Sequence, residues 1–153
     1  MAATVSRRRH RPAVSPSRLA RAAGRALGAL GRPRGRVEIL VVDDAGIRRL
    51  NAAWRGVRRR TDVLAFPLEL ADAPAGLVGQ IVISADTARR QARRGGVPLA
   101  SELDLLVTHG VLHAVGWDDR DPVEAGLMHA RERAILSAGG RRPPAGLWRG
   151  LLP

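Results

Sequence analysis

Apolar residues recur at helical spacing in five stretches of the chain. In the first, leucines and alanines between Ser17 and Leu30 share one side while arginines take the other, and the helix-ending residues Gly31 and Pro33 follow. The other stretches share this periodicity and are bounded by capping residues, proline or glycine. We predict helices over residues 17–30, 44–51, 85–94, 101–115 and 122–135.

Three short runs of aliphatic and β-branched residues lie between these helices. They have the composition of buried strands and cover residues 37–42, 61–66 and 78–84. Ser84, at the end of the third run, is placed to cap the helix that follows. Because helices and strands mix without an internal repeat, the pattern predicts one α+β layer domain.

The length of 153 residues fits a single domain, and no apolar run approaches the roughly 18 residues of a membrane span. Residues 1–16 mix arginine with proline and serine and lack periodicity, which predicts a disordered basic tail. We expect the domain to occupy residues 17–138. Residues 139–153 contain glycine and proline pairs, which predict a loose C-terminal tail.

The formal net charge of +12 is distributed unevenly along the chain. Residues 1–36 hold ten of the 26 basic residues, all of them arginine, and no acid, whereas residues 37–153 are close to neutral. The N-terminal segment can therefore attract phosphate backbones non-specifically, as an RNA-binding arm. An arginine-rich, acid-free start is also typical of an organelle targeting peptide, and the sequence leaves both interpretations open.

The chain has no cysteine, so any metal ion must be held by histidine, aspartate or glutamate. His109 and His113 are four residues apart on the predicted apolar helix, which places both imidazoles on one face. Two core histidines that only satisfy hydrogen bonds would show the same spacing. The pair by itself is therefore a weak indication of a metal site.

The residues after His113 strengthen this interpretation. Gly116 follows three positions later, where a left-handed cap would turn the chain back, and Asp119 can then return a carboxylate to the ion. The spacing H-x-x-x-H-x-x-G-x-x-D is that of zincin-type sites with aspartate in the last place. Three protein ligands with one open position are typical of a catalytic zinc, which lowers the pKa of a bound water to about 7.

Position 110 argues against a protease. Zinc proteases carry a glutamate directly after the first histidine as general base, and this chain has Gly110 there. Peptide hydrolysis by that route would lack its proton acceptor. A small metalloprotease is therefore the least favoured of the enzymatic interpretations.

The stretch from His109 to Asp119, H-G-V-L-H-A-V-G-W-D-D, resembles the signature H-G-x-L-H-L-x-G-Y-D-H of the YbeY family of bacterial rRNA maturation endoribonucleases. The similarity extends to L-N-A-A-W-R-G, T-D-V-L-A-F-P and G-Q-I-V-I-S in the preceding segments, and to Met128 with Glu132 in a late M-x-x-x-E. It covers about residues 37–137. The resemblance implies a zincin-like α+β fold in which a small mixed sheet packs with about five helices.

The family binds zinc through three histidines, so the resemblance implies one Zn²⁺ per chain held by His109 and His113. The third ligand histidine is replaced by Asp119, an acceptable oxygen donor whose negative charge makes the ion a weaker Lewis acid. Asp118 and His129 are alternative third ligands. We expect His129 instead to be a surface histidine.

The family's activity implies a cytoplasmic, single-strand-specific endoribonuclease. Its expected partners are the 3′ region of 16S rRNA and the ribosome or a ribosomal protein, with no specificity for DNA and no role at a membrane. The expected functions are maturation of the 16S rRNA 3′ end and ribosome quality control. The alternative is an rRNA- or ribosome-binding assembly factor whose nuclease activity is weak or absent because of Asp119.

Four arginines complete the expected site. Arg55 corresponds to the arginine of the family's Y-R-G segment, and its planar fork would hold the scissile phosphate beside the catalytic His109 and His113. The RNA-binding rim is expected to comprise Arg58, Arg59 and Arg60. A solvated loop is the alternative interpretation for at least one of these three.

Overall fold

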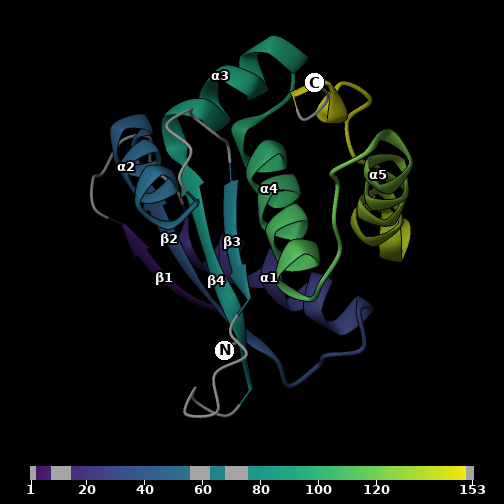
Figure 1. The fold of residues 1–153 in the computed structure, drawn as a ribbon. Helices are drawn as coiled ribbons and strands as arrows, with labels where there is room; N and C mark the ends of the chain where they lie inside the picture. The colour runs from purple at the N-terminus through teal and green to yellow at the C-terminus, as the bar shows by residue number, and fades with distance from the viewer. Residues whose placement is uncertain (1–2, 8–14, 56–62, 68–75, 151–153) are drawn as a thin grey trace.

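A four-stranded sheet forms the centre of the molecule (Figure 1). The computed structural model describes residues 3–7, 15–55, 63–67 and 76–150. Three strands run parallel and the last is antiparallel to its neighbour. In spatial order the strands are β1 (Ala3–Arg7), β2 (Arg36–Val42), β4 (Leu77–Ser84) and β3 (Val63–Pro67). The prediction of a small mixed sheet is confirmed.

Helices pack on both faces of the sheet, and the predicted α+β class is confirmed. All five predicted helices are present, followed by two short 3₁₀ turns in the described part of the chain. They are α1 (Pro16–Ala29), α2 (Asp44–Arg55), α3 (Ala85–Gly95), α4 (Leu99–Ala114), α5 (Pro122–Ser137), η1 (Ala138–Gly140) and η2 (Leu147–Gly150). In these described ranges, no helix combines the length and the apolar character needed to cross a membrane.

Side chains of β2 alternate between two apolar layers, as the period of two of a strand requires. Ile39 and its alternate neighbours join the main core with α1 and α4. Leu40 and Val42 point the other way and pack with Ile47 of α2. The sheet therefore lies between α2 on one face and the α1–α4 pair on the other (Figure 1).

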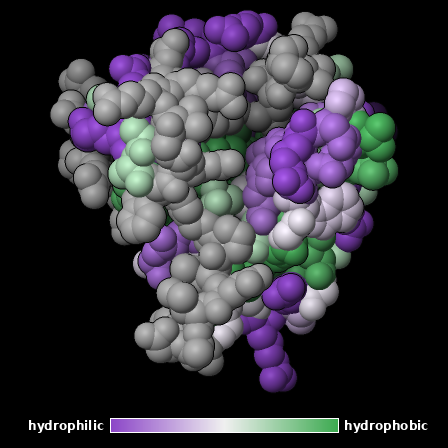
Figure 2. Space-filling view, in the orientation of Figure 1, coloured by the Kyte–Doolittle hydropathy of each residue, from purple (hydrophilic) through white to green (hydrophobic). Residues whose placement is uncertain are grey.

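The ends of α3 follow the capping residues in the sequence. Ser84 accepts a hydrogen bond from the Thr87 amide at 3.2 Å, as predicted, and Gly96 ends the helix with a left-handed φ of 65°. Ala88 and Ala92 lie on the buried side, and the opposite side is rich in arginine. That outer surface forms the hydrophilic top of the view in Figure 2.

Helix α4 is buried on nearly all of its sides, which fits the many apolar residues around its circumference. It contacts α1, α3, α5, β3 and β4. The helix begins at Leu99 rather than at Ser101, because the Pro98 carbonyl accepts hydrogen bonds from the amides of Ser101 and Glu102 and so closes an earlier first turn. Gly110 lies where α4 meets Ile81 of β4.

The two terminal segments differ from the sequence expectations. A disordered tail over residues 1–16 is wrong for Ala3–Arg7, which pair in parallel with β2 as an edge strand. Five residues are too few to show a periodic pattern, so this strand is specified by its partner. A loose tail over residues 139–153 is wrong for η2, where Leu147 and Trp148 are buried against Leu105 and Leu136.

Replacing Gly110 by alanine tests the close approach of α4 to β4. A Cβ at this position would lie 2.7 Å from the Ile81 Cγ2 atom and 3.2 Å from its Cγ1 and Cδ1 atoms. We expect Gly110→Ala to lower the free energy of unfolding by about 1–3 kcal/mol in urea denaturation. Gly126→Ala is the matched control, because α5 leaves open space there, and should stabilise by up to ~1 kcal/mol. Equal changes in the free energy of unfolding for the two variants would contradict the close packing of Gly110 against Ile81.

The Asp44 carboxylate joins α2 to α3 and makes stability depend on pH. It accepts hydrogen bonds from Ser84 Oγ at 2.6 Å, Thr87 Oγ1 at 2.6 Å and Arg90 Nη1 at 2.7 Å. Burial raises the pKa of Asp44, but the bonds from Arg90, Ser84 and Thr87 outweigh it and hold that pKa well below the ordinary 3.8. The stabilisation is therefore complete above pH 3.8 and is lost as the pH falls toward the folded-state pKa.

We expect Asp44→Asn to lower the free energy of unfolding by about 1–3 kcal/mol at pH 7. The difference in the free energy of unfolding between wild type and variant should become smaller below about pH 4. Urea denaturation at several pH values measures this difference. Glu38→Gln, at an exposed carboxylate of β2, is the control and should change stability by less than about 0.5 kcal/mol. A gap that is constant with pH would contradict this account of Asp44.

Candidate metal centre

Helix α4 brings His109 and His113 together on one face, with their Nε2 atoms 3.0 Å apart. Beyond the helix Gly116 adopts a left-handed φ of 107°, and the Trp117 amide donates back to the Leu112 carbonyl at 2.9 Å. The chain reverses there and returns Asp119 to the histidines, with its Oδ2 atom 3.4 Å from each Nε2 atom. The predicted left-handed turn at Gly116 is therefore confirmed.

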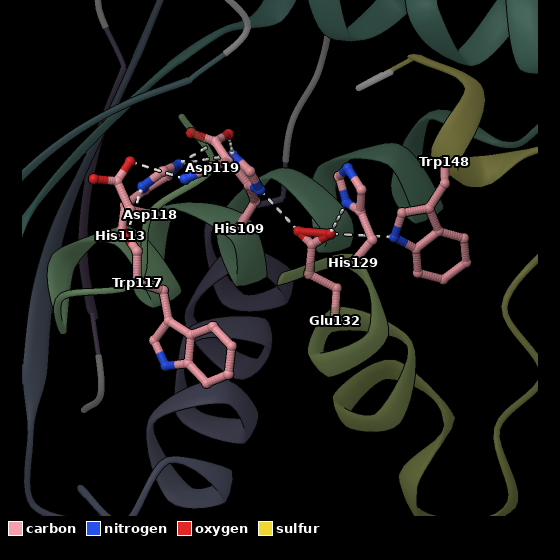
Figure 3. Close-up of polar contacts among 8 residues, drawn as sticks. All are labelled: His109, His113, Trp117, Asp118, Asp119, His129, Glu132 and Trp148. Carbon is pink, nitrogen blue, oxygen red and sulfur yellow. Dashed lines mark hydrogen bonds and ion pairs between the residues drawn. The ribbon is translucent and has the colours of Figure 1, made fainter. Parts of the chain in front are cut away.

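The three donor atoms form a compact group (Figure 3). All of them lie within 4.8 Å of one another, so His109, His113 and Asp119 could hold one metal ion. His109 is buried, His113 is half-buried and Asp119 is exposed, which leaves one side of the group open. Two nitrogens and one carboxylate oxygen are a donor set that suits zinc.

The outer ring nitrogens of both histidines are engaged. His109 Nδ1 lies 2.8 Å from Oε2 of Glu132, and His113 Nδ1 lies 3.0 Å from the Trp117 carbonyl oxygen. Because these acceptors carry no proton to donate, we assign Nδ1–H to each ring, which leaves the Nε2 lone pairs facing Asp119. Hydrogen bonds of this type orient metal-binding histidines and raise their basicity.

The charges around the pair favour the protonation states that bind a cation. Burial lowers the pKa of His113, and the neighbouring His109 lowers it further, against the opposing effect of Asp119. Contact with His109 and the proximity of His113 lower the pKa of Asp119 to about 2, although burial opposes this. A neutral imidazole and an ionised carboxylate are the forms that metal ions require.

Neither alternative third ligand joins the group. The Asp118 carboxylate accepts from Arg120 Nε at 2.6 Å and from the Asp119 amide at 2.8 Å, so it is engaged elsewhere. His129 is not the expected surface histidine, because only 8% of it is exposed and its Nδ1 atom lies 2.6 Å from Glu132 Oε1. The expectation is wrong because α5 turns this residue inward, beside His109 (Figure 3).

Sequence reasoning missed two residues near the histidines. In the sequence Glu132 stands out only through the M-x-x-x-E similarity, yet its buried carboxylate contacts both His109 and His129. Its i, i+3 spacing from His129 was an available signal. Trp148 donates from Nε1 to Glu132 Oε1 at 3.2 Å, and no local pattern in the C-terminal segment predicts that contact.

The predicted arginines lie at the limit of the described structure. Arg55 is the last residue of α2, and its side chain is outside the part that the structure describes. Arg58, Arg59 and Arg60 are also outside the described residues. Their predicted contacts with RNA therefore stay predictions.

An α+β layer fold with two histidines on one helix and a carboxylate beyond the next turn defines a zincin-like protein with a candidate metal centre. The family model described as "Endoribonuclease YbeY" matches residues 11–140. The chain belongs to this family. The predicted resemblance is therefore confirmed.

Individual relatives agree with this assignment. Endoribonuclease YbeY of Geobacter sulfurreducens is 36% identical over 148 residues, which cover 92% of this chain and 99% of the relative. The protein of the same name from Moorella thermoacetica is 43% identical over 136 residues, 82% of this chain and 85% of the relative. That of Anaeromyxobacter dehalogenans is 42% identical over 114 residues, 74% of this chain, and the matched segment spans only 59% of that relative's length.

A solved structure shares the fold. The solution structure of TM1509 from Thermotoga maritima aligns with 97% of this chain and 91% of its own, with a TM-score of 0.59. The sequence identity is 21%, so this likeness concerns the fold alone.

Removing one histidine tests the metal centre. We expect protein purified without chelators to carry about one zinc per chain, and His113→Ala to lose nearly all of it, because two remaining ligands cannot hold the ion tightly. Metal analysis by mass spectrometry measures both. Asp118→Asn is the matched control and should keep its zinc, since Asp118 is bonded to Arg120. If Asp118→Asn lost its zinc while His113→Ala kept it, the assigned ligands would be contradicted.

Proposed function

We propose that this protein is a metal-dependent endoribonuclease specific for single-stranded RNA, acting in 16S rRNA 3′-end maturation and ribosome quality control. The observation that carries the proposal is the convergence of His109 Nε2, His113 Nε2 and Asp119 Oδ2 on one open point. Membership of a family described as an endoribonuclease supplies the reaction class. We place the activity in the cytoplasm, on rRNA and beside the ribosome or a ribosomal protein.

In this proposal His109, His113 and Asp119 hold one Zn²⁺. The ion would act as a Lewis acid and lower the pKa of water, which makes a nucleophile available near neutral pH. The chain's own contribution is to hold the imidazoles in place through Glu132 and the Trp117 carbonyl. The exposed position of Asp119 leaves one side of the group accessible to a phosphodiester.

The remaining roles fall to arginines. Arg55 would grip the scissile phosphate with its guanidinium fork and balance the charge that builds on the phosphoryl oxygens. Arg58, Arg59 and Arg60 would attract the RNA strand by charge alone. The support for these roles is the cluster of arginines directly after α2, together with the match of Arg55 to the family's motif.

The second candidate function is an rRNA- or ribosome-binding assembly factor with little or no nuclease activity. One residue favours it: the carboxylate of Asp119 occupies the third place, where the family signature has a histidine. Its negative charge would reduce the Lewis acidity of the ion and raise the pKa of water bound there. The basic surface for RNA would remain.

Substitutions of Asp119 separate the two functions. For the endoribonuclease, we expect the wild type to cleave a labelled single-stranded RNA and spare its duplex. Asp119→Ala should lower the cleavage rate on the order of 100-fold, because the ion loses its third ligand, whereas Asp119→His should cleave at least as well as the wild type. Gel electrophoresis of the products measures all three rates.

The same experiment identifies the alternative. A wild type that binds the RNA and fails to cleave it, while Asp119→His cleaves, would establish the assembly factor. Zinc-loaded wild type and Asp119→His that both leave the RNA intact would contradict the endoribonuclease proposal. Asp118→His is the matched control for introducing a histidine, and its cleavage rate should equal that of the wild type.

A further inference from the structure

Glu132 is a fully buried carboxylate between the candidate metal centre and the C-terminal segment. Its exposed fraction is 0%, and it faces three ring nitrogens from three different elements. Oε2 lies 2.8 Å from His109 Nδ1, while Oε1 lies 2.6 Å from His129 Nδ1 and 3.2 Å from Trp148 Nε1 (Figure 3). A carboxylate that is buried away from water needs hydrogen-bond donors, so the burial of Glu132 depends on all three rings.

The two oxygens of Glu132 have different partners, and this difference orients the group. Two donors on Oε1 restrict rotation of the carboxylate and keep Oε2 directed at His109. The indole N–H can only donate, so Oε1 of Glu132 must be the acceptor of this hydrogen bond. Glu132 thus connects Trp148 to His109, although Trp148 does not touch the candidate metal ligands in the described contacts.

Trp148 is itself held by packing. It is 6% exposed and belongs to a small apolar cluster with Leu105 of α4, Leu136 of α5 and Leu147. The guanidinium carbon of Arg133, a residue on the same helix as Glu132, lies 4.7 Å from the centre of the Trp148 ring. Leu105 is one helical turn before His109, so η2 packs on the helix that carries the ligand. The segment is thus tied both to Glu132 and to α4.

We infer that the C-terminal segment Leu147–Gly150 is a positioning element of the metal centre, with Trp148 as its positioning residue. Trp148 orients Glu132, and Glu132 holds His109 in the Nδ1–H tautomer that presents Nε2 to the ion. This segment lies beyond residues 11–140, the part that matches the family model. The inference rests on the proposed function only in that His109 serves as a ligand.

The test measures zinc affinity and not cleavage. Partners of metal-binding histidines are worth about 10–100-fold in affinity, so competition with a chromogenic chelator is sensitive enough. We expect Glu132→Gln to weaken Zn²⁺ binding by a factor toward the upper end of this range. Trp148→Phe keeps an aromatic ring and removes the N–H donor, and it should weaken Zn²⁺ binding by about tenfold. Arg133→Gln is the matched control, because it removes a partner of the indole face and leaves the N–H; its affinity should equal that of the wild type.

A double variant distinguishes positioning from simple packing. If Trp148 acts through Glu132, then Trp148→Phe should cause little further loss of zinc affinity in the Glu132→Gln background. Independent losses that multiply would overturn the inference. So would a Trp148→Phe protein that is less stable yet binds zinc as tightly as the wild type, because the residue would then only support the fold.

A metal-free measurement keeps the inference separate from the proposed function. Long-range ¹⁵N NMR of the metal-free chain should show Nδ1–H for His109 and His129, and Trp148→Phe should shift the ring signals of both. Unchanged ring signals would overturn the inference. A wild type that binds no zinc, with these shifts present, would contradict the proposed function and leave the Trp148–Glu132–His109 connection supported.

Discussion

The arrangement of this molecule depends on the close contact between helix α4 and strand β4. Gly110 has no Cβ, and Ile81 occupies the space that one would need. Because protein interiors are close-packed, this contact sets the distance of the helix from the sheet and thereby the place of His109 and His113. It also leaves no room for the glutamate that zinc proteases carry at position 110. The packing that positions the histidines therefore excludes that protease chemistry.

His109 and His113 bring four ring nitrogens onto a helix that is buried on nearly all of its sides. Burial makes an unpaired polar atom costly, and both outer imidazole nitrogens accordingly meet acceptors, from Glu132 and from the Trp117 carbonyl. The inner nitrogens are left to face Asp119. With a pKa far below 7, the Asp119 carboxylate is ionised near neutrality, so the centre carries a negative charge that a third histidine would not supply. That charge bears directly on which of the two candidate functions holds.

The histidine pair and the turn after it were predictable because they depend on local geometry. An i, i+4 spacing places His109 and His113 together on any α-helix, and a glycine such as Gly116 favours the left-handed turn that brings Asp119 back. Helix ends at Ser84 and Gly96 follow from the same short-range rules. The buried position of His129 was not predictable, because the pattern of α5 does not show which side faces α4.

The sequence by itself determined the class of fold, the family and the candidate ligands, since periodicity and spacing act over a few residues. Only the tertiary structure decided what surrounds them. It paired Ala3–Arg7 with β2, buried Trp148 and placed its indole against Glu132. These contacts join segments far apart in the chain, and they form only when packing closes the intervening loops. No local sequence pattern predicts these contacts, because the free energy that stabilises each segment comes from a partner segment distant in the sequence.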